Sequence, residues 1–385
     1  MWRHVASNFL TLLVVIVFLL GGAILWGQSQ YTAEGPLDEP ICLRIEPGST
    51  MRRVSRQLEQ EGAVTSGTIF RLGADYTDRN GDLKAGSWLI PEGASMAEIT
   101  DLVTRGGAST CGTEIVWRVG VTAIEVAVRE LDPATARFEE RVRFDPATGE
   151  PAPEIYETLR ARADTRYRVA FAEGVTSWQV VEGLRAVEVL SGDVTEIPPE
   201  GSLAPDSYEL RAGDTRQSVL DRMTEAQAAI LAAAWEGRAE GLPLRSPQEA
   251  LVLASIVEKE TGVPEERRKV ASVFVNRLRQ GMRLQTDPTV IYGLTEGRGV
   301  LGRGLRQSEL RRETPWNTYV IDGLPPTPIA NPGRESILAA VNPEKTDYLY
   351  FVADGTGGHA FAETLDDHNR NVARWRQIEA GRTGN

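Results

Sequence analysis

An uncharged apolar stretch near the amino terminus constrains this chain more than any other feature. The segment FLTLLVVIVFLLGGAILW (9–26) holds 18 residues without a charge, and the next charged residue is Glu34. As a helix, this stretch rises about 27 Å, enough to cross the hydrocarbon layer of a bilayer. Arg3 precedes it and acidic residues follow it. The positive-inside rule therefore predicts a short cytoplasmic tail (1–4) and places the rest of the chain outside the cytoplasm.

We predict that this stretch is a retained transmembrane anchor at 5–27, followed by a linker at 28–40 that contains Gly35, Pro36 and Pro40. A cleaved signal peptide is the alternative. The apolar core is longer than a usual signal-peptide core, and no clear A-x-A cleavage site follows it, so the sequence favours the anchor.

Composition narrows the class of function. The chain has 385 residues, so we expect two or three folded units. Its formal net charge of -12 argues against a nucleic-acid partner, which requires a basic face, but is compatible with a glycan. Three histidines and two cysteines without a CxxC or HExxH motif predict no metal and no other cofactor. The glycine cluster EGRGVLGRGLR (296–306) lacks the Lys-Ser/Thr of a phosphate loop and is interpreted as a flexible surface loop.

The two cysteines, Cys42 and Cys111, bracket the first candidate module. In an oxidising compartment they can pair, and the bridge would close a loop of about 70 residues and add roughly 4 kcal/mol of stability. Two unrelated buried thiols are the alternative.

Hydrophobic periodicity divides the outer part of the chain into three regions. Residues 41–106 alternate strand and helix patterns and predict a small α/β unit. Residues 107–170 are rich in strand patterns, with an exposed turn at 145–153. Residues 171–385 predict a larger α+β domain with helices at 224–242, 246–262 and 265–282. In the second of these helices, Ser246, Pro247 and Glu249 form a capping-box start.

A weak repeat links two of these regions. The stretch EGVTSWQVVEGL (173–184) echoes PEGAS (91–95), and both suggest a strand–turn–helix unit.

Several strings in the carboxy-terminal half resemble the MltG/YceG family of endolytic murein transglycosylases. They are EGSLAPDSYEL, LASIVEKETG, VASVFVNRLRQGMRLQTDPTVIYGL, NTYVIDGLPPTPIANPG and YLYFVADGTGGHAF. The resemblance implies an α+β fold with an N-terminal transmembrane helix, a LysM-like subdomain at 41–106 and a transglycosylase catalytic domain at 171–385. Residues 107–170 match poorly and are interpreted as a β-rich insertion.

The family resemblance also implies an activity. Members cleave the β-1,4 bond between N-acetylmuramic acid (MurNAc) and N-acetylglucosamine (GlcNAc) in peptidoglycan without water, and the muramyl C6 hydroxyl closes onto C1. One carboxyl group can serve as acid and then base, whereas a usual hydrolase needs two. The resemblance implies nascent glycan strands as substrate, a bacterial inner membrane location with an extracytoplasmic catalytic domain, and peptidoglycan synthases as candidate partners.

Two carboxyl groups in LASIVEKETG compete for the catalytic role. Helical spacing gives both Glu258 and Glu260 an apolar flank, so desolvation does not separate them. A solvated helix end is the plain alternative for either one. The resemblance places the family's catalytic glutamate at Glu258, and Lys259 is predicted to point to solvent.

Candidate substrate-binding residues follow in LQTDPTVIYG and NTY. They are Gln285, Thr286, Asp287, Asn317 and Tyr319. In the functional interpretation, these residues line a sugar cleft, where Asn317 hydrogen-bonds an acetamido group and Tyr319 stacks on a sugar. The alternative is local turn chemistry and ordinary structural roles. His359, in a glycine-flanked turn, either caps the cleft or is structural.

Two other functions stay open from the sequence. One is a peptidoglycan-binding scaffold without turnover, which would use the LysM-like unit. The other is a true hydrolase that pairs Glu258 with Asp287.

Overall fold

The computed structural model describes residues 2–107, 109–162, 164–211 and 213–383. The fold is mixed α+β, and it divides into two compact units. The first comprises residues 1–115, 127–144 and 151–167, and the second comprises 116–126, 145–150 and 168–385.

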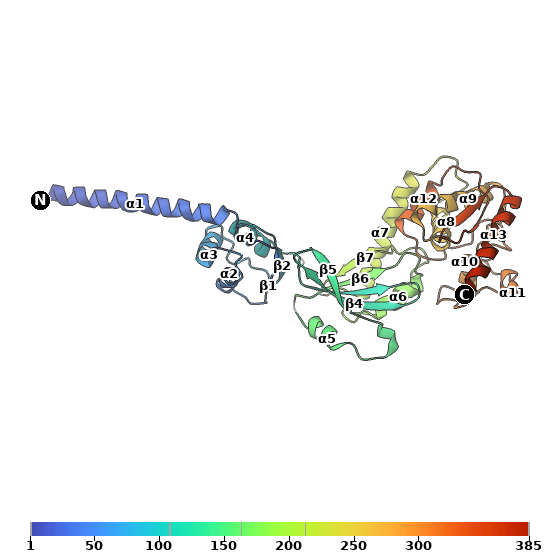
Figure 1. Cartoon of the computed structure of the whole chain (residues 1–385), viewed down its shortest axis with the longest axis horizontal. Helices are drawn as coiled ribbons and strands as arrows, with labels where there is room; N and C mark the ends of the chain where they lie inside the picture. Colours follow the sequence, from blue (N-terminus) through green and yellow to red (C-terminus); the bar gives the residue numbers. More distant parts are fainter. Residues whose placement is uncertain (1, 108, 163, 212, 384–385) are drawn as a thin grey trace. The chain divides into compact units, whose positions relative to one another are not determined.

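The chain begins with one long helix, α1 (Trp2–Thr32), drawn in blue in Figure 1. Its segment Leu10–Thr32, with a mean hydropathy of 2.6, is long and apolar enough to cross a membrane by length and composition. The helix continues beyond the expected end of the anchor. Tyr31 in its last turn is buried, and the Tyr31 hydroxyl donates a hydrogen bond of 2.8 Å to Thr100 Oγ1.

The segment 28–40, predicted as a linker, packs against the small subdomain. Leu37 is also buried in the core of the small subdomain. The Gly35 N–H donates to the Gly93 carbonyl at 2.9 Å, and the Gly93 N–H donates to the Leu37 carbonyl at 3.0 Å. Glycine and proline do not make a linker flexible when its backbone is bonded in this way and its side chains are buried.

The small subdomain follows the order strand, helix, helix, strand, helix. These elements are β1 (Ile41–Ile45), α2 (Met51–Gln60), α3 (Gly67–Tyr76), β2 (Gly86–Ile90) and α4 (Met96–Arg105). The two strands pair antiparallel, with Ile41 opposite Ile90. A core that includes Leu43, Leu58 and Phe70 lies beneath them. The unit thus has its own hydrophobic centre.

A disulfide joins Cys42 to Cys111, with their Cα atoms 5.8 Å apart. This confirms the pairing that the sequence left open.

The next strands form one five-stranded sheet in the order β5-β4-β3-β6-β7. Its members are β3 (Thr113–Val119), β4 (Ile124–Asp132), β5 (Arg137–Phe144), β6 (Arg166–Phe171) and β7 (Ser207–Leu210). The strands expected in 107–170 are present, together with a short 3₁₀ turn, η1 (Pro146–Thr148), and helix α5 (Glu154–Arg160). Because β3 to β5 share their sheet with β7, this segment does not form a sheet of its own.

The weak repeat in the sequence corresponds to two strand–turn–helix units. In one, β2 leads through Gly93 into α4, and in the other β6 leads through Gly174 into α6 (Ser177–Arg185). Both glycines have positive φ, 66° and 80°, a region that other residues avoid. Both helices then begin with a capping box, at Ser95 and Thr176.

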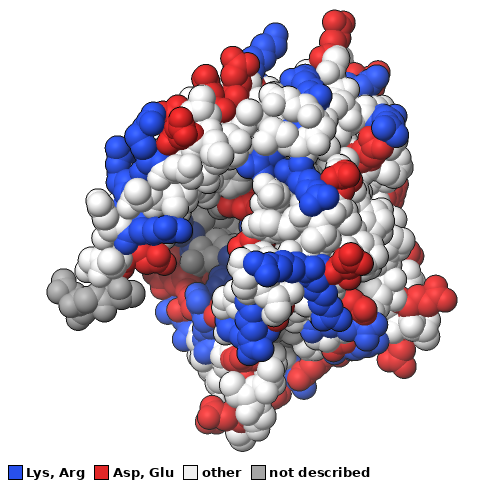
Figure 2. Space-filling view, turned by 90° about the vertical axis from the view of Figure 1, so that its right-hand side faces the viewer, with Lys and Arg blue, Asp and Glu red and all other residues white. Residues whose placement is uncertain are grey.

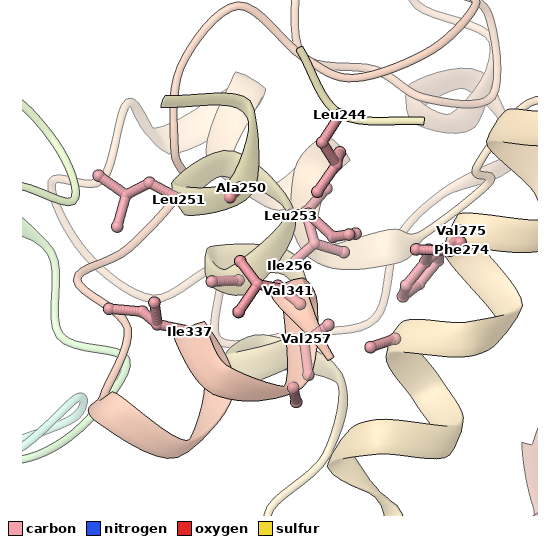
Figure 3. Packing of buried hydrophobic residues seen from close by; sticks show 14 of the residues in the cluster. Leu244, Ala250, Leu251, Leu253, Ile256, Val257, Phe274, Val275, Ile337 and Val341 are labelled. Carbon is pink, nitrogen blue, oxygen red and sulfur yellow. The ribbon is translucent and has the colours of Figure 1, made fainter. Parts of the chain in front are cut away.

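The second unit is built around helix α8 (Pro247–Glu260). Half of the predicted capping box is present: the Ser246 hydroxyl accepts a hydrogen bond from the Glu249 N–H at 3.2 Å, whereas the Glu249 carboxylate accepts the Arg245 N–H at 2.7 Å and not the Ser246 N–H. Every residue from Ala250 to Val257 is buried, so this helix is the centre of the core. Figure 3 shows side chains of the neighbouring helices α9 and α12 gathered around it.

The other elements surround α8. They are α7 (Arg216–Glu236), η2 (Pro264–Glu266), α9 (Arg267–Arg279), α10 (Asp287–Thr295), α11 (Gln307–Leu310), α12 (Arg334–Val341), β8 (Tyr350–Ala353), β9 (His359–Ala362) and α13 (Leu365–Thr383). Helix α7 begins eight residues before the expected 224, because Thr215 forms a capping box with Ser218. Strands β8 and β9 pair antiparallel.

Candidate active site

The carboxy-terminal turn of α8 presents three charged residues in sequence: Glu258, Lys259 and Glu260. Successive helical residues differ by about 100° around the axis, so the three side chains point in different directions. Each one enters a different environment.

Glu260 lies among polar groups from the start of α10 and from β9. The Thr286 hydroxyl donates a hydrogen bond to Glu260 Oε1. Burial raises the pKa of Glu260, and the neighbouring Asp287 carboxylate raises this pKa further. The Thr286 bond, His359 and Arg277 act in the opposite direction. The balance is a buried carboxyl group whose pKa lies above the ordinary value, as a general acid requires.

Two further threonines hold Thr286, the hydrogen-bond partner of Glu260, in place. The Thr286 N–H donates to Thr318 Oγ1 at 3.0 Å, and the hydroxyls of Thr289 and Thr318 are 2.9 Å apart. All three are buried. Gln285, just before them, is exposed and adopts a φ of 50°, while its N–H donates to the Thr318 carbonyl at 3.1 Å. The turn therefore fixes the Thr286 hydroxyl and leaves the Gln285 side chain open to solvent.

Asp287 and Tyr319 form a hydrogen-bonded pair beside this turn. The Tyr319 hydroxyl donates to Asp287 Oδ1 at 2.6 Å. Burial and this bond raise the pKa of Tyr319, so the phenol stays protonated. Asp287 is exposed and Tyr319 is partly exposed, so both can meet a ligand near Glu260.

Asn317, in contrast, is fully buried. Its side-chain amide donates to the carbonyls of Glu309, Leu310 and Arg312, at 3.3, 3.1 and 2.7 Å. Its Oδ1 accepts the Tyr319 N–H at 3.0 Å. The predicted contact of Asn317 with an acetamido group is therefore corrected, because this side chain has its partners inside the protein and organises the loop before Tyr319.

Glu258 lies in a different setting. Its side chain is only 6% exposed, its Oε2 accepts the Gly333 N–H at 2.9 Å, and its Oε1 lies 3.9 Å from the Arg267 guanidinium. Arg267 also pairs with Glu173 at 3.3 Å. Burial and the nearby Glu258 charge raise the pKa of Glu173. Glu258 is therefore held by a backbone N–H from the loop before α12, with a guanidinium at longer range.

Lys259 does not point to solvent, which corrects the prediction. Its Nζ donates to the Gly174 carbonyl at 3.2 Å, and burial lowers its pKa. It forms part of the wall of a cavity of about 290 Å³. The glycine-rich segment 297–302, interpreted from sequence as a flexible surface loop, forms another part of this wall.

Sequence reasoning missed Glu200, a carboxyl group close to this cavity. Glu200 Oε1 accepts the Ser177 N–H at 2.8 Å, and its Oε2 accepts the Tyr292 hydroxyl at 3.2 Å. Burial raises the pKa of Glu200. The string EGSLAPDSYEL contained the residue, but nothing local distinguishes it from a surface glutamate.

His359 has a structural partner. Its N–H donates to Glu266 Oε1 at 2.9 Å, and its Nδ1 lies 2.8 Å from Glu266 Oε2. The ring also lies edge-on to Phe351. Within the described ranges, no group of three or more His, Cys, Asp or Glu is arranged to hold a metal ion. Figure 2 shows positive and negative side chains interspersed on the face that it presents.

Comparisons with known proteins all indicate the same family. A model of the YceG-like family matches residues 135–374. An endolytic murein transglycosylase of Bacillus subtilis (strain 168) is 27% identical over 354 residues, which cover 91% of this chain and 89% of that protein. The endolytic murein transglycosylase of Streptococcus pneumoniae serotype 2 is also 27% identical, over 96% of this chain and 65% of that protein.

A solved structure is also similar. The crystal structure of a putative yceG-like protein from Listeria monocytogenes is 26% identical, with a TM-score of 0.46, and the match covers 86% of this chain and 99% of that one. The match to the family model begins at residue 135, inside the segment 107–170 interpreted as an insertion. The second half of that segment therefore lies within the family's own sequence pattern.

Proposed function

Because the chain belongs to the YceG-like family, we propose that it is a membrane-anchored endolytic peptidoglycan lytic transglycosylase. It cleaves the MurNAc-β-1,4-GlcNAc bond of nascent glycan strands, leaves 1,6-anhydro-MurNAc ends and so terminates glycan elongation. The names of the relatives support this activity. The observation that carries it is the partly buried Glu260 carboxyl group, which accepts the Thr286 hydroxyl and lies beside the partly exposed Asp287–Tyr319 pair.

The proposed mechanism uses one carboxyl group twice. Protonated Glu260 donates its proton to the glycosidic oxygen as the bond to C1 of MurNAc breaks. The resulting carboxylate accepts the proton of the MurNAc C6 hydroxyl as that oxygen bonds to C1. No water is consumed, and Glu260 ends protonated again. The Thr286 hydroxyl, bonded to Oε1, stabilises the carboxylate between the two steps and leaves Oε2 to carry the proton.

The resemblance in sequence assigns this role to Glu258, and that assignment stays a proposal; the neighbours of Glu260 support a second candidate. Glu258 is engaged by the Gly333 N–H and faces Arg267. Glu260 lies next to Thr286 and Asp287, two of the predicted substrate-binding residues. We propose Glu260 as the acid and base, to be tested against Glu258, the candidate that the resemblance assigns; Glu258 also holds the end of α8 against the loop before α12.

The substrate contacts in this proposal are Gln285, Asp287 and Tyr319. All three side chains are at least partly exposed near Glu260, whereas Thr286 is buried and acts through Glu260. Asp287 can accept a sugar hydroxyl, and the Tyr319 ring can stack on a sugar face.

The proposed location rests on α1. A helix of this hydropathy supports a single-pass anchor in the bacterial inner membrane, with a cytoplasmic amino terminus and an extracytoplasmic catalytic domain. The unit at 41–106 is proposed to be LysM-like and to bind glycan, and its separate core supports a separate role. Peptidoglycan synthases are proposed as partners, because nascent strands are found where they are made.

One digest tests the function. The purified full chain in detergent is incubated with uncrosslinked glycan strands, and the products are analysed by chromatography and mass spectrometry. Shorter strands with anhydro ends, lighter by one water than reducing ends, are expected. Reducing ends would identify a hydrolase, and intact strands that still bind the protein would identify a scaffold.

A further inference from the structure

A cavity next to the proposed acid is not used by the mechanism above. It lies within the second unit, and its volume of about 290 Å³ is at the small end of ligand pockets, which span roughly 300–1,000 Å³. Aliphatic side chains form much of its wall, among them Val121, Ile291, Leu301 and Ile329. Lys259 contributes an ammonium group to this wall.

The Lys259 ammonium has capacity for another partner. An ammonium carries three donors, and the Gly174 carbonyl at 3.2 Å takes one of them. Among the residues that the structure describes, no carboxylate lies within ion-pair distance of it. The nearest acidic groups have other partners: Glu258 binds the Gly333 N–H, and Glu200 binds the Ser177 N–H and the Tyr292 hydroxyl.

A half-buried ammonium on an aliphatic wall is matched by a carboxylate attached to a small aliphatic body. We propose that this cavity binds the carboxylate-bearing peptide stem that muramic acid carries, with Lys259 as partner of the carboxylate. The volume has room for the first small residues of a stem and not for a long peptide. This inference rests on the proposed function, since it takes peptidoglycan as the substrate.

Helix α10 places this cavity beside the proposed catalytic centre. Pro288 and Ile291, in the first two turns of α10, form part of the cavity wall. Thr286 and Asp287, at its amino-terminal end, contact or adjoin Glu260. The first two turns of α10 therefore connect the neighbours of Glu260 to the cavity wall.

The glycine-rich segment 297–302 closes the rim of the cavity. The Thr176 hydroxyl donates to the Gly297 carbonyl at 2.6 Å, which ties the rim to the start of α6. Gly297 and Gly302 have φ of 72° and 67°, so the backbone follows a path that other residues would strain. This hydrogen bond holds the start of the rim, and residues 298–300 and 302 are exposed.

The test compares two substrates that differ only in the stem: uncrosslinked glycan with intact stems, and the same glycan with the stems removed. The ratio of kcat/KM for the two is measured for the wild type, Lys259→Met, Lys259→Arg and the control Lys345→Met, which removes an exposed ammonium elsewhere. The wild type should prefer stem-bearing strands. Lys259→Met should lower the ratio by about tenfold or more, the worth of one charge-assisted hydrogen bond. Lys259→Arg should retain part of the preference for stem-bearing strands, and Lys345→Met should show the same ratio as the wild type.

Two results would overturn the inference: a wild type without preference, or a Lys259→Met protein that loses rate equally on both substrates. A binding measurement separates failure of this inference from failure of the proposed function. Soluble muramyl tripeptide with free carboxylates, and its fully amidated counterpart, are titrated by calorimetry into full-length Glu260→Gln protein with and without Lys259→Met. Binding of the free acid that Lys259→Met abolishes supports the cavity even if neither glycan is cleaved. Equal binding of both peptides, or none, contradicts it.

Discussion

Replacement of each glutamate at the end of α8 by glutamine gives the sharpest test of the proposed mechanism. Glutamine keeps the shape of the side chain and can still accept a hydrogen bond, but it cannot donate an acidic proton. Glu260→Gln retains an oxygen for the Thr286 hydroxyl, so the turn before α10 should stay in place. Glu258→Gln retains an oxygen for the Gly333 N–H. The two variants are therefore matched in structure and differ in the chemistry that they remove.

The expected losses differ in size. Glu260→Gln removes general acid and base catalysis, which contributes roughly 10²–10⁴-fold, or about 2.7–5.5 kcal/mol of activation free energy. Glu258→Gln removes one charge that faces Arg267 across 3.9 Å. Because both side chains are nearly buried, the loss should lower the free energy of unfolding, and the loss of rate in the folded protein should be smaller than for Glu260→Gln.

The pH dependence adds a second, independent measurement. The acid must be protonated in the free enzyme, so kcat/KM should fall as the pH rises through the raised pKa of Glu260. Thr286→Val removes a donor that favours the carboxylate, so the falling limb should move to higher pH. Asp287→Asn removes a negative charge that disfavours the carboxylate, so the limb should move to lower pH. Opposite displacements by two adjacent residues have no simple structural explanation.

The assay follows release of anhydro-ended strands by chromatography, after circular dichroism and thermal unfolding have shown equal folding of the variants. The reasoning is refuted if Glu258→Gln is inactive while Glu260→Gln keeps near wild-type activity. It is also refuted if Thr286→Val and Asp287→Asn move the limb in the same direction.

Three further predictions concern the fold and the location. Joint replacement of Cys42 and Cys111 by serine should lower the free energy of unfolding by about 4 kcal/mol, because the bridge spans 69 residues. Denaturant titration of the wild type and the variant measures this difference, and equal midpoints would contradict the prediction. Asn317→Ala should lower the free energy of unfolding by about 2–4 kcal/mol, because three loop carbonyls lose their donor. A decrease in Tm of less than about 2 °C would instead mean that water replaces the amide. The anchor at 5–27 should keep the mature protein with membranes until detergent is added, and soluble protein that begins near residue 28–35 would indicate a cleaved signal peptide.

The sequence by itself determined the features that depend on neighbours along the chain. The apolar run predicts the long first helix, and Ser246, Pro247 and Glu249 predict the start of α8. The glycine turns before α4 and α6 were visible as a weak repeat, because positive φ and capping boxes are local requirements. The strands of 107–170 followed from alternation alone.

Only the tertiary structure decided the environment of each side chain at the end of α8. Glu260 meets Thr286 from 26 residues away, Glu258 meets Gly333 from 75 residues away, and Lys259 meets the Gly174 carbonyl from 85 residues away. Helical periodicity states which residues share a face, but it does not state what packs against that face. Burial, hydrogen bonding and nearby charge set a pKa, and all three come from these distant segments. The motif therefore predicted two candidate carboxyl groups, and the packing of the loops around α8 gives each of them different partners.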